Sequence, residues 1–147
     1  MDTRKQAHVV WLGEGLEFQA RISTGYSFTM RSPSNSQGAS PMEFLLASVA
    51  GCTAMDVISI LHKKRQKVDG LEVQIEGIQA SGSPRVYTSA TITYIVQGDE
   101  IDPAAVEHAI YLSKTKYCSA SIMFERAGVE ITTAYHIEAS KKSKANS

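Results

Sequence analysis

The sequence predicts an α+β fold in which antiparallel sheets pack around one long, buried central helix. Two observations support this prediction. The middle of the chain, over residues 40–65, is unusually apolar, and runs of alternating apolar and polar residues flank it on both sides. These runs come in neighbouring groups with few helices between them, which favours antiparallel pairing over parallel crossovers.

The central stretch carries helix signals at both of its ends. Ser40 can cap the first turn, Pro41 suits the first helical position, and Glu43 completes a capping box with Ser40. The cations of residues 62–65 suit a helix C-terminus. Most positions from 44 to 61 are apolar and do not keep to one stripe, so we expect a helix that is buried most of the way round.

Alternation on either side of this helix predicts the strands. Before the helix we expect a three-stranded meander at residues 8–12, 16–22 and 26–31, followed by a polar loop over 32–39. After the helix the same pattern predicts strands at 71–80, 86–96 and 129–138. Between the last two strands we expect a helix that opens at Asp102-Pro103, a break near Lys116 and a short helix over 119–126.

The length of 147 residues suits one domain with a substantial core. We therefore predict a single domain over residues 1–139. Residues 140–147 are polar and rich in lysine, which is typical of a solvated, disordered tail.

The charge balance narrows the possible partners and the location. With 15 basic and 15 acidic residues the net charge is zero, which argues against a nucleic-acid partner and against an anionic membrane surface. The apolar run is slightly short for a membrane span and Asp56 interrupts it, so we expect no membrane partner. The first seven residues lack the hydrophobic segment of a secretory signal, so we expect a cytoplasmic protein.

The two cysteines, Cys52 and Cys118, are the residues best suited to chemistry. Cys52 lies inside the apolar helix, where a small, inert, buried residue is the simplest interpretation. Cys118 follows a helix break and precedes a short helix, whose free N–H groups would favour its thiolate. Two cysteines are also the minimum for a peroxide-reducing cycle, in which one forms a sulfenic acid and the other condenses with it to a disulfide. Both interpretations stay open at this point.

Two motifs make the sequence similar to a known family. SPMEFLLASVAGCTAMDVISIL, over residues 40–61, and SKTKYCSASIMFERAGVEI, over residues 113–131, resemble the OsmC/Ohr family of osmotically induced protein C and organic hydroperoxide resistance proteins. The resemblance covers about residues 5–139 and is closest to the OsmC-like branch of uncertain substrate.

The resemblance implies both a fold and an activity. The fold would be OsmC-like, in an intertwined homodimer whose central helices lie between two sheets and whose active sites lie at the subunit interface. Cys52 would be the peroxidatic cysteine and Cys118 the resolving one, in a cofactor-free, thiol-dependent peroxidase of the oxidative stress response. Its substrate would be an organic hydroperoxide, and an external dithiol reductant would restore both thiols.

The sequence departs from the hydroperoxide-resistance pattern beside the reactive cysteine. That branch has an arginine in the first hairpin turn and a glutamate directly after the proline that starts the helix. Here the turn over residues 13–15 has no arginine, and Met42 follows Pro41. Arg31 and Arg21 are possible substitutes, although strand alternation favours a solvent-facing position for both.

Glu43 is the weaker catalytic candidate. Nine residues of helix would place it about 180° around the axis from Cys52 and ~13 Å along it. A capping role is therefore favoured over a role in the active site. Glu43 remains a third catalytic candidate after Cys52 and Cys118.

Asp56 and the histidines do not suggest a metal centre. Asp56 lies one turn beyond Cys52 on the same helix face, and a carboxylate raises the pKa of a nearby thiol. We therefore expect Asp56 to pair with a cation or a backbone group. The four histidines are scattered over separate elements, and none has a metal-ligand spacing with a cysteine, so we expect no metal site.

Two hypotheses of function follow. The first is the cofactor-free peroxidase, with an apolar pocket around Cys52 whose candidate walls are Phe44, Leu45, Met55 and Ile122. The alternative is a dimeric protein that binds a small apolar ligand and has redox-passive cysteines. The apolar helix could line a pocket in either case.

Overall fold

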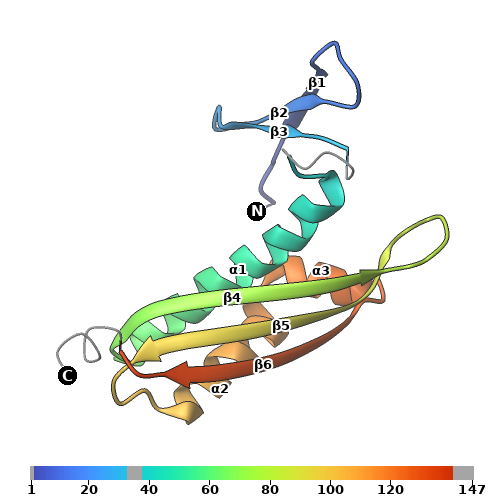
Figure 1. Ribbon diagram of the computed structural model, residues 1–147. Helices are drawn as coiled ribbons and strands as arrows, with labels where there is room; N and C mark the ends of the chain where they lie inside the picture. Colours follow the sequence, from blue (N-terminus) through green and yellow to red (C-terminus); the bar gives the residue numbers. More distant parts are fainter. Residues whose placement is uncertain (1, 33–37, 141–147) are drawn as a thin grey trace. The chain divides into compact units, whose positions relative to one another are not determined.

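The structure is a computed structural model that describes residues 2–32 and 38–140. It contains two compact units, Met1–Leu45 and Leu46–Ser147 (Figure 1). The predicted single domain over residues 1–139 stays a prediction. The predicted polar loop over 32–39 lies for the most part outside the described residues.

The first unit is built on a three-stranded antiparallel meander, as predicted. Its strands are β1 (Ala7–Trp11), β2 (Phe18–Ile22) and β3 (Ser27–Met30), in the order β1-β2-β3. Gly25 has a φ of 95° in the second turn, a conformation that favours glycine because it has no Cβ. In the first turn the indole N–H of Trp11 donates a hydrogen bond to the carbonyl oxygen of Gly15 at 2.9 Å.

Helix α1 (Pro41–Lys63) begins with the predicted capping box. The backbone N–H of Ser40 donates to Glu43 Oε1 at 3.0 Å, and the backbone N–H of Glu43 donates to Ser40 Oγ at 3.3 Å. These reciprocal bonds satisfy two donors that a helix N-terminus otherwise leaves free. The helix ends at Lys63, and Arg65 then takes a left-handed φ of 60°.

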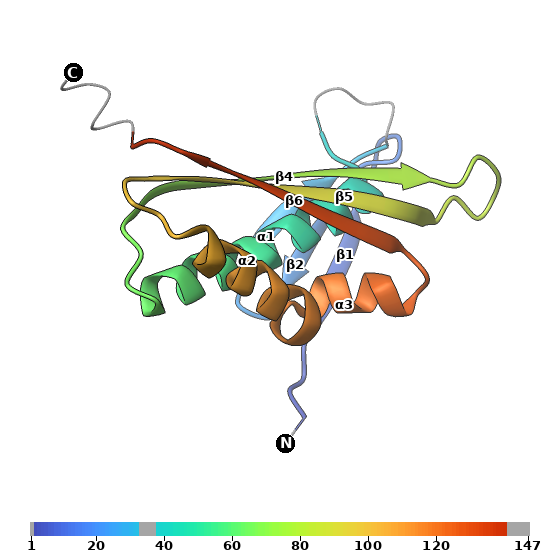
Figure 2. The ribbon, with the colours of Figure 1, turned by 90° about the horizontal axis from the view of Figure 1, so that it is seen from below.

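The second unit is one sheet with helices on one face (Figures 1 and 2). The sheet contains β4 (Val68–Gln79), β5 (Tyr87–Gly98) and β6 (Glu130–Glu138), in that order. The helical face is formed by the part of α1 within this unit, α2 (Pro103–Leu112), the π-helical turn η1 (Ser113–Tyr117) and α3 (Ser119–Arg126). The core is formed by Ile92, Tyr94 and Val96 of the sheet with Val57, Leu61 and Val106 of the helices.

The prediction of antiparallel pairing is wrong for the last strand. β4 and β5 pair antiparallel, but β5 and β6 pair parallel, with Tyr94 opposite Tyr135. A parallel neighbour needs a crossover of a dozen or more residues. The segment from α2 to α3 is long enough to provide one, because both helices and η1 lie between the two strands.

The prediction that α1 is buried most of the way round is also wrong for the single chain. Its fully covered residues are Val49, Thr53, Val57 and Leu61, one on each successive turn. Met55 on another face is 73% exposed. One chain therefore covers a stripe of this helix and leaves much of its apolar surface open.

The length argument against a membrane span does not hold either. α1 has 23 residues, and its most apolar window has a mean hydropathy of 2.0, which is enough to cross a membrane by length and composition. Its buried stripe of four residues nevertheless packs within the second unit, as the core helix of a globular unit does.

The predicted tail begins one residue too early. Ser140 is only 2% exposed. Its backbone N–H donates to Asp99 Oδ1 at 3.3 Å, and its hydroxyl donates to Asp69 Oδ2. Residues 141–147 lie outside the described part of the chain.

Candidate active site

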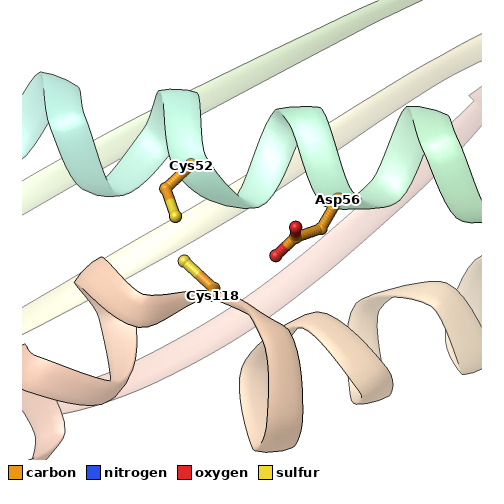
Figure 3. Close-up of side chains that lie close together, drawn as sticks. All are labelled: Cys52, Asp56 and Cys118. Carbon is orange, nitrogen blue, oxygen red and sulfur yellow. The ribbon is translucent and has the colours of Figure 1, made fainter. Parts of the chain in front are cut away.

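The second unit brings Cys52 and Cys118 together. Cys52 lies in the middle of α1, and Cys118 lies between η1 and α3. Their Sγ atoms and one carboxylate oxygen of Asp56 all lie within 4.8 Å of one another (Figure 3). Both cysteines are free thiols. We refer to Cys52, Asp56 and Cys118 as the cysteine cluster.

The break before α3 positions Cys118, as the sequence predicted. The backbone N–H of Cys118 donates to the carbonyl oxygen of Ser113 at 2.8 Å and closes the π-helical turn. Cys118 itself is extended, with φ of −79° and ψ of 95°, and caps α3. Its Sγ accepts a hydrogen bond from the backbone N–H of Ser121 at 3.4 Å. Single π-turns of this kind are frequent at functional sites.

The two thiols differ in exposure. Cys118 is fully buried, whereas Cys52 is partly accessible. Burial raises the pKa of the Cys118 thiol, the hydrogen bonds from Ser121 oppose that increase, and the nearby Cys52 adds to it. The backbone N–H at the start of α3 thus favours the Cys118 thiolate, as expected, but the loss of hydration outweighs it and the pKa is raised on balance.

Asp56 ends a chain of buried hydroxyl groups. Ser113 Oγ donates to Asp56 Oδ2 at 3.0 Å, and Thr53 Oγ1 lies 2.8 Å from Ser113 Oγ. Thr53 Oγ1 also lies 2.7 Å from the Tyr94 hydroxyl. The prediction that Asp56 pairs with a cation or backbone group is thus wrong, because its observed partner is a hydroxyl.

The carboxylate sets the direction of this chain. A hydroxyl has one hydrogen to donate, and Ser113 gives its hydrogen to Asp56. Thr53 must then donate to Ser113, and Tyr94 must donate to Thr53. The donors thus run in the order Tyr94, Thr53, Ser113, and all of them point toward Asp56. Burial is the main cause that raises the pKa of Tyr94, which keeps it a donor.

A groove borders the cluster at Asp56. Its volume is about 370 Å³, and its other lining residues come from α1, the loop after it, α2 and η1: Ser59, Ile60, Lys63, Lys64, His108, Leu112 and Tyr117. None of the four predicted pocket walls lines this groove. Phe44 instead packs on Phe28 in the first unit, with ring centroids 4.9 Å apart.

The other predicted site residues have partners or positions within the first unit. Glu43 bonds with Ser40, and the hydrogen bond from the Ser40 backbone is the main cause that lowers the pKa of Glu43. Arg31 Nε lies 3.4 Å from Glu17 Oε1. Arg21 is exposed on β2. The catalytic role of Glu43 stays a prediction.

Sequence reasoning missed several members of the site. It considered metal ligation through histidine, whereas the structure gathers two thiols and a carboxylate. The spacing of Cys52 and Asp56, four residues apart in a helix, was the signal for this pair. Thr53, Ser113 and Tyr94 carried no signal, because such residues are common throughout the chain.

Comparisons with known proteins agree with this architecture. A family model described as OsmC-like protein matches residues 33–134. Protein YhfA of Escherichia coli K12 is 40% identical over 134 residues, which cover 91% of this chain and 98% of YhfA.

Solved structures show the same fold. A hypothetical protein from Aquifex aeolicus VF5 has a TM-score of 0.83 at 28% identity, and the match covers 96% of this chain and all of that one (100%). An organic hydroperoxide resistance protein from Elizabethkingia anophelis has a TM-score of 0.73 at 13% identity, over 94% and 99% of the two chains.

Proposed function

Because this chain belongs to the OsmC-like protein family, we propose that it is a thiol-dependent peroxidase that reduces organic hydroperoxides through Cys52 and Cys118. The observation that carries the proposal is the approach of two free thiols from separate elements to within 4.8 Å. The fold shared with an organic hydroperoxide resistance protein supports the same class of substrate.

In the first step the Cys52 thiolate attacks the distal oxygen of the hydroperoxide. The O–O bond breaks, the alkoxide takes a proton and leaves as an alcohol, and Cys52 becomes a sulfenic acid. The difference in exposure supports this role for Cys52, because a substrate reaches the partly accessible thiol before the buried one.

In the second step Cys118 resolves the sulfenic acid. Cys118 Sγ attacks Cys52 Sγ, the S–S bond forms, the S–O bond breaks and water leaves. The proton of the Cys118 thiol must be removed, and Asp56 is the carboxylate within reach of both sulfur atoms. Asp56 would take that proton and pass it to the departing hydroxide, so atoms and charge balance.

An external dithiol completes the cycle. It reduces the disulfide to two thiols and is itself oxidised to a disulfide, so the cycle needs no bound cofactor. We place this chemistry in the cytoplasm, where such reductants keep thiols reduced.

We further propose that the protein is a homodimer. Its first unit exposes Val9, Val10, Trp11, Leu12, Leu16 and Tyr26, and α1 exposes Leu45 and Met55. So much apolar surface is unusual for a monomer, and a second copy of the chain is the simplest cover.

Thiol counting tests the proposed cycle. One equivalent of cumene hydroperoxide, added to the reduced protein, should remove two free thiols per chain and release one alcohol. Hydrogen peroxide should react more slowly, because it has no apolar group to bury in a pocket. An unchanged thiol count would reject the peroxidase.

One further residue, Glu43, and one alternative function are open to the same assay. Glu43→Gln keeps the cap, so a large fall in rate would assign Glu43 to the active site. A purely capping Glu43 leaves the rate within a few-fold. A dimeric binder of a small apolar ligand remains the second candidate, favoured by the apolar hollow of about 360 Å³ in the first unit that Val9, Leu16, Phe18 and Met30 help to line. Binding of the alcohol product without any thiol loss would favour that candidate.

A further inference from the structure

The cysteine cluster has the composition of a metal site as well as of a redox site. We propose that the reduced protein binds one thiophilic divalent cation, best satisfied by Zn²⁺, through Cys52 Sγ, Cys118 Sγ and a carboxylate oxygen of Asp56. This site competes with the proposed peroxide cycle for the same two thiols, but it does not depend on that cycle.

The distances suit such an ion. Zinc binds sulfur at about 2.3 Å and carboxylate oxygen at about 2.0–2.2 Å, so two sulfur ligands of a tetrahedral ion lie ~3.8 Å apart. The three ligand atoms here already lie within 4.8 Å of one another. Closing around an ion therefore needs side-chain adjustments of about 1 Å, with the helices left in place.

The charges of the cluster favour a cation. A carboxylate and two sulfur atoms gather at a site that is closed on one side, where Cys118 is fully buried. Two thiolates beside Asp56 would repel one another without a positive partner. A divalent ion removes this repulsion, and each thiol that binds gives its proton to water without any oxidation.

The surroundings hold the ligands in place. Ser113 Oγ donates a hydrogen bond to Asp56 Oδ2 and accepts one from Thr53 Oγ1. These two hydrogen bonds fix the position of the Asp56 carboxylate. The backbone N–H of Cys118 is bonded to the carbonyl oxygen of Ser113. Outer partners of this kind contribute to metal affinity, and their loss costs roughly 10–100-fold.

The donor set and access select the ion. Two thiolates favour a soft or borderline cation over Mg²⁺ or Ca²⁺. Three protein ligands leave the fourth position of a tetrahedral zinc ion for water. Asp56 also lines the groove of about 370 Å³, which gives an ion and its water a route to the cluster.

Cobalt is the direct probe of this site. Reduced, metal-free protein should bind one Co²⁺ per chain and develop sulfur-to-cobalt charge-transfer absorption with the visible bands of a tetrahedral ion. One equivalent of Zn²⁺ should bleach these bands. Oxidation to the Cys52–Cys118 disulfide removes both sulfur ligands, so the oxidised protein should release its ion.

Variants assign the ligands. Cys52→Ser and Cys118→Ser should each lose most of the charge-transfer band. Asp56→Asn and Ser113→Ala should weaken binding tenfold or more. Glu125→Gln is the matched control, because it removes one exposed carboxylate of α3 outside the cysteine cluster. This variant should bind Co²⁺ with the same affinity as the unaltered protein.

The proposal is overturned if no charge-transfer band forms or if binding survives both cysteine substitutions. It is also overturned if Asp56→Asn binds as tightly as Glu125→Gln, and this isosteric change gives an answer even if a cysteine variant fails to fold. Thiol loss with hydroperoxide in the metal-free protein is measured separately, so a failure of the metal site and a failure of the peroxidase give different results.

Discussion

The two thiols differ in exposure, so we expect them to have distinct roles in the proposed cycle. Cys52→Ser should abolish hydroperoxide consumption, because the serine hydroxyl is not nucleophilic enough to attack the O–O bond. Cys118→Ser should keep the first step and trap Cys52 as a sulfenic or over-oxidised acid. Mass spectrometry of each variant after one equivalent of cumene hydroperoxide checks both outcomes. Oxidation of Cys118 in the Cys52→Ser variant would reverse the assignment.

The pH dependence of disulfide formation reports on Asp56. Burial raises the pKa of Cys118 above its ordinary value, so at neutral pH this residue is a thiol and its thiolate becomes more abundant as the pH rises. Without a base, the rate of disulfide closure should increase about tenfold per pH unit below that pKa. Asp56 as proton acceptor should flatten this dependence in the unaltered protein.

Asp56→Asn should therefore slow closure at pH 7 and make it steeply dependent on pH. Rapid-mixing measurements of sulfenic acid decay from pH 6 to 9 give the two profiles. If the closure rate depends on pH with the same slope in both proteins, Asp56 does not accept the proton of Cys118. The rate of the first step, sulfenic acid formation, serves as the internal control.

At the scale of elements, the hydroxyl chain joins helix α1 to strand β5. Thr53→Val removes the acceptor of the buried Tyr94 hydroxyl and should cost about 1–3 kcal/mol in the free energy of unfolding. Adding Tyr94→Phe to the Thr53→Val variant removes the Tyr94 hydroxyl, which would otherwise be left without an acceptor. The double variant should therefore be more stable than Thr53→Val alone. Urea denaturation of the four proteins completes the cycle. Strictly additive losses would show that the two hydroxyls are not coupled.

Local chemistry explains which elements the sequence could predict. The capping box at Ser40 and the alternating strands depend on neighbours in sequence, and all of them were found. The short helix after the break was also found, over Ser119–Arg126. The strand β6 was found too, but its parallel pairing with β5 was missed, because nothing local distinguishes a parallel edge strand from an antiparallel one.

The residues of the candidate site also fall into those that the sequence could predict and those that it could not. Its cysteines could be predicted because there are only two, and because the motifs around them resemble a family. The buried hydroxyl chain could not, since Thr53, Tyr94 and Ser113 meet only after α1, β5 and η1 have packed. The net rise in the pKa of Cys118 could not be predicted for a related reason. Its helix position is visible in sequence, but its complete burial is a tertiary property.

At the scale of the whole molecule, the exposed apolar face of α1 predicts a homodimer. Light scattering at micromolar concentration should give twice the chain mass of 16.0 kDa. We expect an obligate interface above ~2,000 Å² in total. Met55→Glu should weaken the dimer strongly, because Met55 is an exposed apolar residue on α1, whereas Glu125→Gln should leave the mass unchanged. A stable folded monomer of the unaltered protein would contradict this prediction.

The parallel strand β6 also has a consequence for the order of folding. Neighbouring strands β4 and β5 pair locally, with Gly77 opposite Ala90, but β6 joins β5 across a long segment, with Ile95 opposite His136. Closing that long loop costs more chain entropy, so the hairpin should be protected first and β6 last. Cys118 lies within the intervening segment, so we expect its thiol to reach Cys52 only after that segment has packed onto α1. Pulse-labelled hydrogen exchange during refolding should show amides of β4 and β5 protected before those of β6. Newly made chains would thus pass through a period in which both sulfur atoms are unprotected and apart.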